Sequence, residues 1–368
     1  MSMDKLIEAS NRYGANIEYV IAGGGNTSWK TDDFMYVKGS GTELGTIKAD
    51  GFVKVDLKKL DGIWSKSYSE DEDKREEEVL VDLMASRFPE EKDKRPSVET
   101  LLHGLLPYTY VVHTHPALIN GITCSKNAET LISRLFGEKA LWVSITNPGY
   151  ILAKVVKEKI NEHIKSGKEF PLMIFLQNHG VFVSGNTMEE IDSIYDIMFE
   201  EINKRINKNP VTVRTSVDSH ARKKAEQVIE EALGKNLSVL GFYNSDILRF
   251  AESQENFAPL TLSFTPDHIV YYGFKPVYSE DLMSLGDELR NYVKTNDVNP
   301  RLAVVKGIGA FAINTSDTLV EKSALLFEDD VKIAVYTDSF GGYQFMPQDK
   351  IDFIRNWEVE KYRVSLSK

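Results

Sequence analysis

The stretch that decides both fold and chemistry is Val-Val-His-Thr-His-Pro at residues 111–116. Its apolar start predicts a buried β-strand, and the proline ends it because proline donates no ladder hydrogen bond. Strand side chains alternate between faces, so His113 and His115 point the same way, roughly 6 to 7 Å apart along the strand. The two imidazoles are therefore placed to share one metal ion.

A third ligand has to come from elsewhere in the chain. The apolar strand at residues 172–176 runs into Gln-Asn-His-Gly and resumes at residues 181–183, so His179 interrupts a strand and precedes a glycine. Three histidines with an open position are typical of a catalytic zinc site rather than a structural one. We therefore predict that His113, His115 and His179 bind one divalent ion, with zinc (Zn2+) as the expected metal.

The alternative is that these are ordinary core histidines. A single His-x-His pair is a weak signal, and a buried histidine bonded to the backbone explains either residue alone. The chain has only seven histidines, however, and these three stand at strand ends beside glycine or proline. His103 lies one helical turn after Glu99, so it is expected either beside the site or in the core.

Strands and helices alternate along the rest of the chain, which favours an α/β architecture. We expect helices at 3–14, 151–165 and 189–206, and strands at 19–22, 34–38 and 172–176, with a glycine-rich turn at 23–29. Residues 207–219 lose apolar periodicity and contain a proline. That segment is the expected boundary between domains at 1–207 and 220–368.

The second domain is either a diverged copy of the first or an unrelated α/β unit. Residues 306–312 repeat the pattern of residues 177–183, with Ile308 at the position of His179, and residues 267–273 echo residues 33–39. Glycine-x-phenylalanine hairpins also recur by chance, so both interpretations stay open. Either way, no metal ligands are expected in the second domain.

Composition excludes several classes of function. The chain has 368 residues and a net charge of −11, which argues against a nucleic-acid partner. Its one cysteine, Cys124, cannot form an internal disulfide, which indicates a reducing compartment. No signal peptide is recognisable, and no apolar run reaches the roughly 18 to 20 residues that span a bilayer. We expect a cytoplasmic protein with no membrane partner.

Several motifs together resemble the class II aldolase/adducin family over roughly residues 5–205. That resemblance implies a three-layer αβα domain, a divalent metal and a phosphorylated sugar substrate. The motifs are Gly25-Asn26-Thr27-Ser28, Ser40-Gly41-Thr42, Pro96-Ser97-Val98-Glu99, Val112-His113-Thr114-His115-Pro116 and Asn178-His179-Gly180.

The C-terminal part resembles the aldolase portion of the bifunctional rhamnulose-phosphate aldolase/lactaldehyde dehydrogenase proteins. In those proteins a short-chain dehydrogenase domain follows the aldolase portion. The present sequence ends where that domain would begin, so we expect no Rossmann domain here. The matching segments are 301–312, Gly341-Gly342-Tyr343-Gln344 and Trp357-Glu358-Val359-Glu360.

The resemblance assigns roles to single residues. Glu99 matches the family's catalytic glutamate, which implies a general acid/base and a fourth metal ligand when substrate is absent. The alternative is a glutamate favoured at a helix N-terminus by the macrodipole. The matches to the three phosphate loops are Gly25 and Asn26, Ser40 and Gly41, and Ser97.

Three other residues bear on how the substrate phosphate is bound and on the rest of the site. Val98 stands where the fuculose enzyme has a serine, so the phosphate contacts there differ. Lys38 is a candidate charge for the phosphate, although an exposed strand lysine is the commoner explanation. The family also uses a tyrosine from a neighbouring subunit, for which Tyr150 is the candidate here.

The implied reaction is cleavage of a ketose 1-phosphate, such as rhamnulose or fuculose 1-phosphate, into dihydroxyacetone phosphate and an aldehyde. Epimerisation, decarboxylation and dehydration use the same metal platform in this superfamily and remain alternatives. A non-catalytic adducin-like module is the alternative from another class. Family members assemble as rings, so we expect a homo-oligomer.

Overall fold

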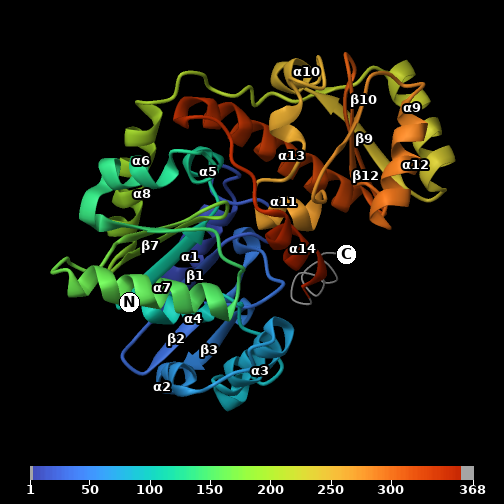
Figure 1. Cartoon of the computed structure of the whole chain (residues 1–368). Helices are drawn as coiled ribbons and strands as arrows, with labels where there is room; N and C mark the ends of the chain where they lie inside the picture. Colours follow the sequence, from blue (N-terminus) through green and yellow to red (C-terminus); the bar gives the residue numbers. More distant parts are fainter. Residues whose placement is uncertain (1–2, 358–368) are drawn as a thin grey trace. The chain divides into compact units, whose positions relative to one another are not determined.

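The computed structural model describes residues 3–357 of the chain (Figure 1). Of the C-terminal motif named above, residues 358–360 lie outside that range. The chain divides into two compact units, Met1–Ile119 with Ala128–Lys204, and Asn120–Asn127 with Arg205–Lys368. Across residues 3–357, no helix combines the length and apolar character that a membrane span requires.

The first unit is built on a seven-stranded mixed sheet with β4 at its centre. The strand order is β3-β2-β1-β4-β7-β6-β5, and every neighbouring pair is antiparallel except β5 and β6. The strands are β1 (Asn26–Lys30), β2 (Phe34–Lys38), β3 (Phe52–Asp56), β4 (Tyr110–Thr114), β5 (Ala140–Val143), β6 (Met173–Leu176) and β7 (Gly180–Gly185).

Helices cover both faces of this sheet. On one face, Leu101 of α4 and Val156 of α7 share an apolar core with Val111 of β4. On the other, the Tyr195 hydroxyl of α8 lies 2.7 Å from Thr114 Oγ1. The helices of this unit are α1 (Met3–Gly14), α2 (Leu57–Gly62), α3 (Glu72–Ala85), α4 (Thr100–Leu105), α6 (Ala128–Phe136), α7 (Tyr150–Lys165) and α8 (Met188–Asn203). Helix α5 (Ala117–Thr123) spans the division, since its residues from Asn120 onward belong to the second unit. The predicted three-layer αβα fold is confirmed.

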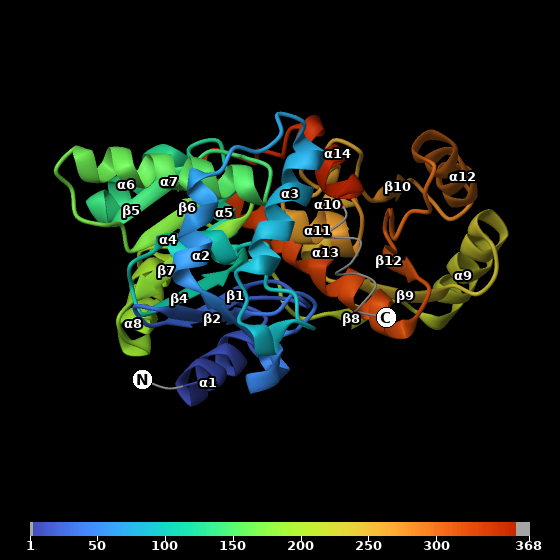
Figure 2. The same cartoon turned by 90° about the horizontal axis from the view of Figure 1, so that it is seen from below.

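The second unit is a smaller α/β unit with a five-stranded sheet in the order β10-β11-β12-β9-β8. Figures 1 and 2 show α13 on one face of this sheet and α9 with α12 on the other. The strands are β8 (Thr215–Ser216), β9 (Ser238–Tyr243), β10 (Val277–Ser279), β11 (Leu302–Val305) and β12 (Gly309–Asn314). The helices are α9 (Ser219–Leu233), α10 (Ser245–Phe250), α11 (Pro266–Tyr271), α12 (Leu285–Asn296), α13 (Asp317–Thr337) and α14 (Gln348–Asn356).

Four strands of the second unit repeat four strands of the first. The order β9-β12-β11-β10 has the same strand directions as β4-β7-β6-β5, with one parallel pair at the edge. The connecting turns also agree, since the His179 amide donates to Leu176 O at 3.2 Å and the Ile308 amide to Val305 O at 3.1 Å. The expected match between residues 177–183 and 306–312 is therefore confirmed in local structure.

The other expected match, between residues 267–273 and residues 33–39, is wrong. Phe34–Lys38 forms strand β2, whereas Pro266–Tyr271 forms helix α11, which Thr265 caps by accepting from the His268 amide at 3.5 Å. Short apolar runs do not distinguish strand from helix, and the proline at the first helical position was the better signal.

Two local predictions near the glycine turn also need correction. Residues 19–22 form turns rather than a strand, with the Tyr19 amide donating to Asn16 O at 2.9 Å. Strand β1 instead begins at Asn26, inside the segment predicted to be a turn. The glycines at positions 23–25 confine the turn to residues before that strand.

Candidate active site

The three histidines come from strand β4, from the residue just after it, and from the turn between β6 and β7. His113 on β4 pairs with Asn26 on β1 and with Phe182 on β7. His115 follows the end of β4, and His179 lies in the turn between β6 and β7. A Cβ atom on Gly180 would lie 2.4 Å from Thr114 O and 2.7 Å from His115 Cδ2. Glycine after His179 is therefore what lets this turn approach β4.

The structure brings the three imidazoles together. One nitrogen from each ring lies within 4.8 Å of the others. The ring of His113 is centred 4.7 Å from that of His115 and 5.0 Å from that of His179. His113 Nε2 and His115 Nε2 are only 2.9 Å apart. The His113 side chain is fully buried, while the other two keep some exposure.

The Glu99 carboxylate lies against this cluster. Its Oε1 atom is 3.2 Å from His113 Nε2 and 3.5 Å from His179 Nε2. Its Oε2 atom accepts a hydrogen bond from Asn26 Nδ2. Burial by itself would raise the pKa of Glu99, but the neighbouring imidazoles outweigh it and hold that pKa well below its usual range. The carboxylate is therefore ionised at neutral pH.

The donor set of this cluster fits a divalent cation. His113 Nδ1 lies 3.0 Å from Val181 O, a carbonyl that can only accept, so Nδ1 carries the ring proton. In the neutral ring, the Nε2 lone pair then faces both His115 and the Glu99 carboxylate. Converging lone pairs repel one another unless a cation or proton lies between them. A backbone carbonyl on the other ring nitrogen is also how metal-binding histidines are usually oriented.

Phe182, which was not predicted from the sequence, and His103, which was expected beside the site or in the core, form a chain of ring contacts with His113. Phe182 stacks on the His113 ring at 3.9 Å between centroids, and His103 packs edge-on against Phe182 at 5.4 Å. Burial lowers the pKa of His103 to about 3, so this ring is neutral. Its Nδ1 atom lies 2.8 Å from Ser28 Oγ. His103 thus supports the site from the core.

The three segments matched to phosphate loops lie side by side. The Ser40 amide donates to Arg95 O at 2.8 Å, and the Ser97 amide donates to Lys38 O at 3.1 Å. Lys38 Nζ donates to Gly23 O at 3.0 Å, which connects the glycine turn to the other two segments. Lys38 is buried, so the exposed strand lysine expected as the commoner explanation is wrong.

Not every amide in these segments is free to bind an anion. Those of Ser40 and Ser97 are used within the backbone, and Ser97 Oγ accepts from the Glu99 amide at 3.2 Å. Within the described range, the Gly41 amide and the Ser40 hydroxyl have no partner. Gly41 and Gly25 both have positive φ, of 84° and 70°. A Cβ on Gly25 would lie 2.9 Å from His113 O, so this glycine allows the turn to approach β4.

Tyr150 lies in the core of the first unit. Its ring stacks on Trp64 at 5.8 Å and meets Tyr68 edge-on at 5.2 Å. Its amide donates to Glu76 Oε2 at 3.0 Å. These contacts pack Tyr150 within its own unit, and a role at the site of a neighbouring subunit stays a prediction.

The repeated strands show which residues replace the histidines in the second unit. Phe182 pairs with His113 in the first unit, and Phe311 pairs with Gly241 in the second. By the same register Tyr243 stands for His115, and Ile308 for His179. A Cβ on Gly309 would lie 2.5 Å from Phe242 O, which reproduces the contact of Gly180. Within residues 3–357, the histidine cluster of the first unit is the one group of three or more candidate ligands.

Comparison with known families supports these observations. A family model described as the Class II Aldolase and Adducin N-terminal domain matches residues 4–191, about half of the chain. The match includes Glu99 and all three histidines.

One curated relative is the "Uncharacterized oxidoreductase YuxG" of Bacillus subtilis (strain 168), which is 26% identical over 415 residues. The alignment covers 99% of this chain and 58% of the relative, so the chain spans less than two thirds of that protein.

Two solved structures are also similar. The N-terminal class II aldolase domain of a conserved protein from Thermoplasma acidophilum is 28% identical, with a TM-score of 0.46, covering 55% of this chain and 93% of that one. The L-fuculose-1-phosphate aldolase from Thermus thermophilus is 16% identical, with a TM-score of 0.35, covering 55% of this chain and 94% of that one.

Proposed function

The chain belongs to the class II aldolase and adducin family, and from that premise we propose that it is a zinc-dependent aldehyde-lyase. Its substrate is a phosphorylated ketose such as rhamnulose or fuculose 1-phosphate. The products are dihydroxyacetone phosphate and an aldehyde. The protein acts as a homo-oligomer in the cytoplasm.

The observation that carries this proposal is the convergence of three imidazoles and one ionised carboxylate. Three imidazole nitrogen donors, from His113, His115 and His179, leave room in a tetrahedral set for a substrate oxygen. Bound there, a divalent cation supplies Lewis-acid stabilisation of the negative charge that develops on the carbonyl and hydroxyl oxygens of the substrate. A binding module has no physical need for such a cluster.

Glu99 is the group that moves a proton. Because its carboxylate is ionised, Oε1 accepts a proton from the carbon beside the carbonyl of dihydroxyacetone phosphate in the condensation direction. In the cleavage direction the same oxygen returns that proton. Asn26 holds Oε2 and so fixes which oxygen faces the imidazoles.

The substrate phosphate is held at the segments that lie side by side next to this cluster. The Gly41 amide and the Ser40 hydroxyl donate to it, with Gly25, Asn26 and Ser97 shaping the pocket. Buried Lys38 adds positive charge to the same region. This arrangement orients the substrate so that its reacting carbon faces Glu99.

The direct test is turnover of a panel of ketose 1-phosphates by the zinc-loaded protein, with release of dihydroxyacetone phosphate as the readout. We expect release from at least one deoxyketose phosphate. Complete absence of turnover across the panel would overturn the proposal. Product analysis by NMR in the same assay distinguishes cleavage from epimerisation, decarboxylation or dehydration.

A further inference from the structure

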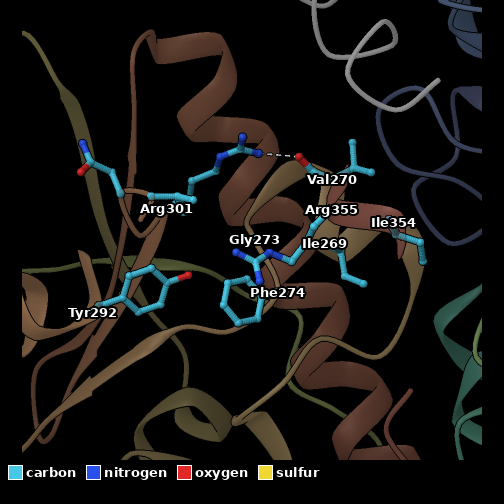
Figure 3. Close-up of a pocket in the computed structure, with 10 residues that line it drawn as sticks. Ile269, Val270, Gly273, Phe274, Tyr292, Arg301, Ile354 and Arg355 are labelled. Carbon is cyan, nitrogen blue, oxygen red and sulfur yellow. Dashed lines mark hydrogen bonds between the residues drawn. The ribbon is translucent and has the colours of Figure 1, made fainter. Parts of the chain in front are cut away.

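One cavity lies wholly within the second unit, whereas the histidine cluster belongs to the first (Figure 3). Its volume is about 310 Å³, at the lower end of the roughly 300 to 1,000 Å³ typical of small-molecule sites. Its wall comes from α11 and the loop after it, from α12, from the segment before β11, and from α14. The residues that matter here are Ile269, Phe274, Tyr292, Arg301, Ile354 and Arg355.

The cavity is basic although the chain is acidic. Two arginines line it and no aspartate or glutamate does, in a chain whose net charge is −11. The two guanidinium groups come from different elements, since Arg301 precedes β11 and Arg355 lies in α14 (Figure 3). Positive charge converging on one concave surface is what attracts an anion.

Arg301 has no carboxylate partner among residues 3–357. Its Nη1 atom donates to Val270 O, the bond drawn in Figure 3, and lies 3.4 Å from Tyr271 O. Burial lowers the pKa of Arg301, and the neighbouring Tyr292 offsets this only in part. A partly buried cation paired only with carbonyls gains free energy when an anion binds beside it.

Arg355 is held in place but keeps donors available. Its guanidinium lies over the Phe274 ring at 4.0 Å from the centroid. Among residues 3–357 it pairs with Asp352, at 3.4 Å, and that carboxylate is 49% exposed. Exposed ion pairs of this length are weak, so they do not compete strongly with a ligand.

We propose that this cavity binds a small organic anion whose carboxylate or phosphate group pairs with Arg301 and Arg355. The apolar side chains of Ile269, Phe274 and Ile354 cover the hydrocarbon or ring portion of that ligand. A neighbouring cavity, also of about 310 Å³, shares Val270, Val298, Asn299 and Arg301 with the first, so Arg301 lines both.

The test is isothermal titration calorimetry of the full chain with benzoate and phenyl phosphate, which join each anionic group to an apolar ring. Benzamide is the neutral control. We expect saturable millimolar or tighter binding of at least one anion and none of benzamide, and the tighter anion identifies the preferred group. Arg301→Gln and Arg355→Gln should each weaken binding about tenfold or more.

Arg290→Gln is the matched control, because Arg290 lies in the same unit, is 55% exposed and pairs with Asp287 at 2.7 Å. Thermal unfolding checks that each variant folds. If Arg301→Gln unfolds, Arg355→Gln carries the test, since no backbone carbonyl depends on it. The proposal is overturned if neither anion binds, if folded arginine variants bind as the parent does, or if Ser40→Ala rather than the arginine variants abolishes binding.

Discussion

At the scale of single residues, the proposed chemistry rests on the Glu99 carboxylate, which burial alone would neutralise and the neighbouring histidines hold ionised. Glu99 is buried with one oxygen facing His113 and His179 and the other bonded to Asn26. A buried, ionised carboxylate with these contacts is placed to accept a proton. The alternative role, a helix N-terminal glutamate, does not account for contacts to two imidazoles.

Replacing Glu99 with Gln should therefore remove the proton acceptor and leave the three histidines in place. We expect kcat for ketose-phosphate cleavage to fall by about 10² to 10⁴-fold, the usual range for a general acid or base. Metal content, measured by mass spectrometry, should stay unchanged. Glu90→Gln is the control, because Glu90 is exposed. Unchanged kcat in Glu99→Gln would contradict the assignment.

Sequence patterns predicted the three histidines, and the family resemblance predicted Glu99, but neither predicted what surrounds them. The i, i+2 spacing of His113 and His115 is enough to predict that both side chains lie on one face, because successive side chains of a strand alternate between faces. The stacking of Phe182 on His113 depends on the register between β4 and β7, which no local pattern specifies. Likewise the burial of Lys38 follows from a bond to Gly23, fifteen residues away.

At the scale of elements, the hairpin between β6 and β7 determines where His179 lies. Asn178 has a positive φ of 55°, and Gly180 contacts the end of β4 where a side chain would clash. The same hairpin occurs between β11 and β12, where Gly309 contacts Phe242. The fold thus keeps the hairpin even where its histidine is absent.

Gly180→Ala should separate His179 from the other two imidazoles. The added Cβ has to move away from backbone at Thr114, so we expect destabilisation of about 1 to 3 kcal/mol and a large loss of zinc affinity. Gly309→Ala is the matched variant, since its Cβ meets the equivalent backbone in the second unit. It should destabilise the chain without changing zinc affinity. Equal zinc affinity in both variants, measured by competition with a chelating dye, would argue against this view.

Helices α11 and α13 are joined by a buried histidine between two aspartates. His268 Nε2 lies 3.1 Å from Asp329 Oδ2, and its Nδ1 lies 2.9 Å from Asp330 Oδ1. Burial lowers the pKa of His268, but the two aspartates outweigh it and raise that pKa from 6.5 to about 9. Folding therefore favours the protonated ring.

The stability that this ion group contributes should be fully present below about pH 6.5 and be lost as pH rises through about 9. We expect the free energy of unfolding to fall over that window by roughly 3 kcal/mol at most. Urea unfolding at several pH values measures it. His268→Gln should be less stable at pH 6 and should lack this pH-dependent component. If the free energy of unfolding of the variant fell with pH as steeply as that of the parent, groups other than His268 would cause the change.

Patterning at the element scale was most reliable for long segments in which a second signal accompanied it, although the short runs at 34–38 and 172–176 were also predicted correctly, as β2 and β6. Helices predicted at 151–165 and 189–206 occur as α7 and α8, where a long apolar period coincides with a turn or a cap. The predictions were wrong at residues 19–22 and 267–273. A run of only four to seven residues fits a strand, a turn or a short helix equally well. The backbone conformation of these residues depends on contacts made elsewhere in the fold.

At the scale of the whole molecule, one strand arrangement occurs twice, and only the first copy has histidines at the three matched positions. The register places Gly241, Tyr243 and Ile308 where the first unit has His113, His115 and His179. The second copy keeps the hairpin glycine, Gly309, and a helix that follows the hairpin, α13, which Ser316 caps as Thr187 caps α8. Glu99 lies beside the three histidines of the first unit.

The most direct test of the central claim is the number of divalent metal ions bound per chain. Elemental mass spectrometry of the purified protein, after chelation and reloading with zinc, should give one ion per chain. His179→Ala should lose it, while His220→Ala, on an exposed residue of α9, should retain it. No bound metal in the parent protein, or a full ion in a folded variant lacking all three histidines, would contradict the account.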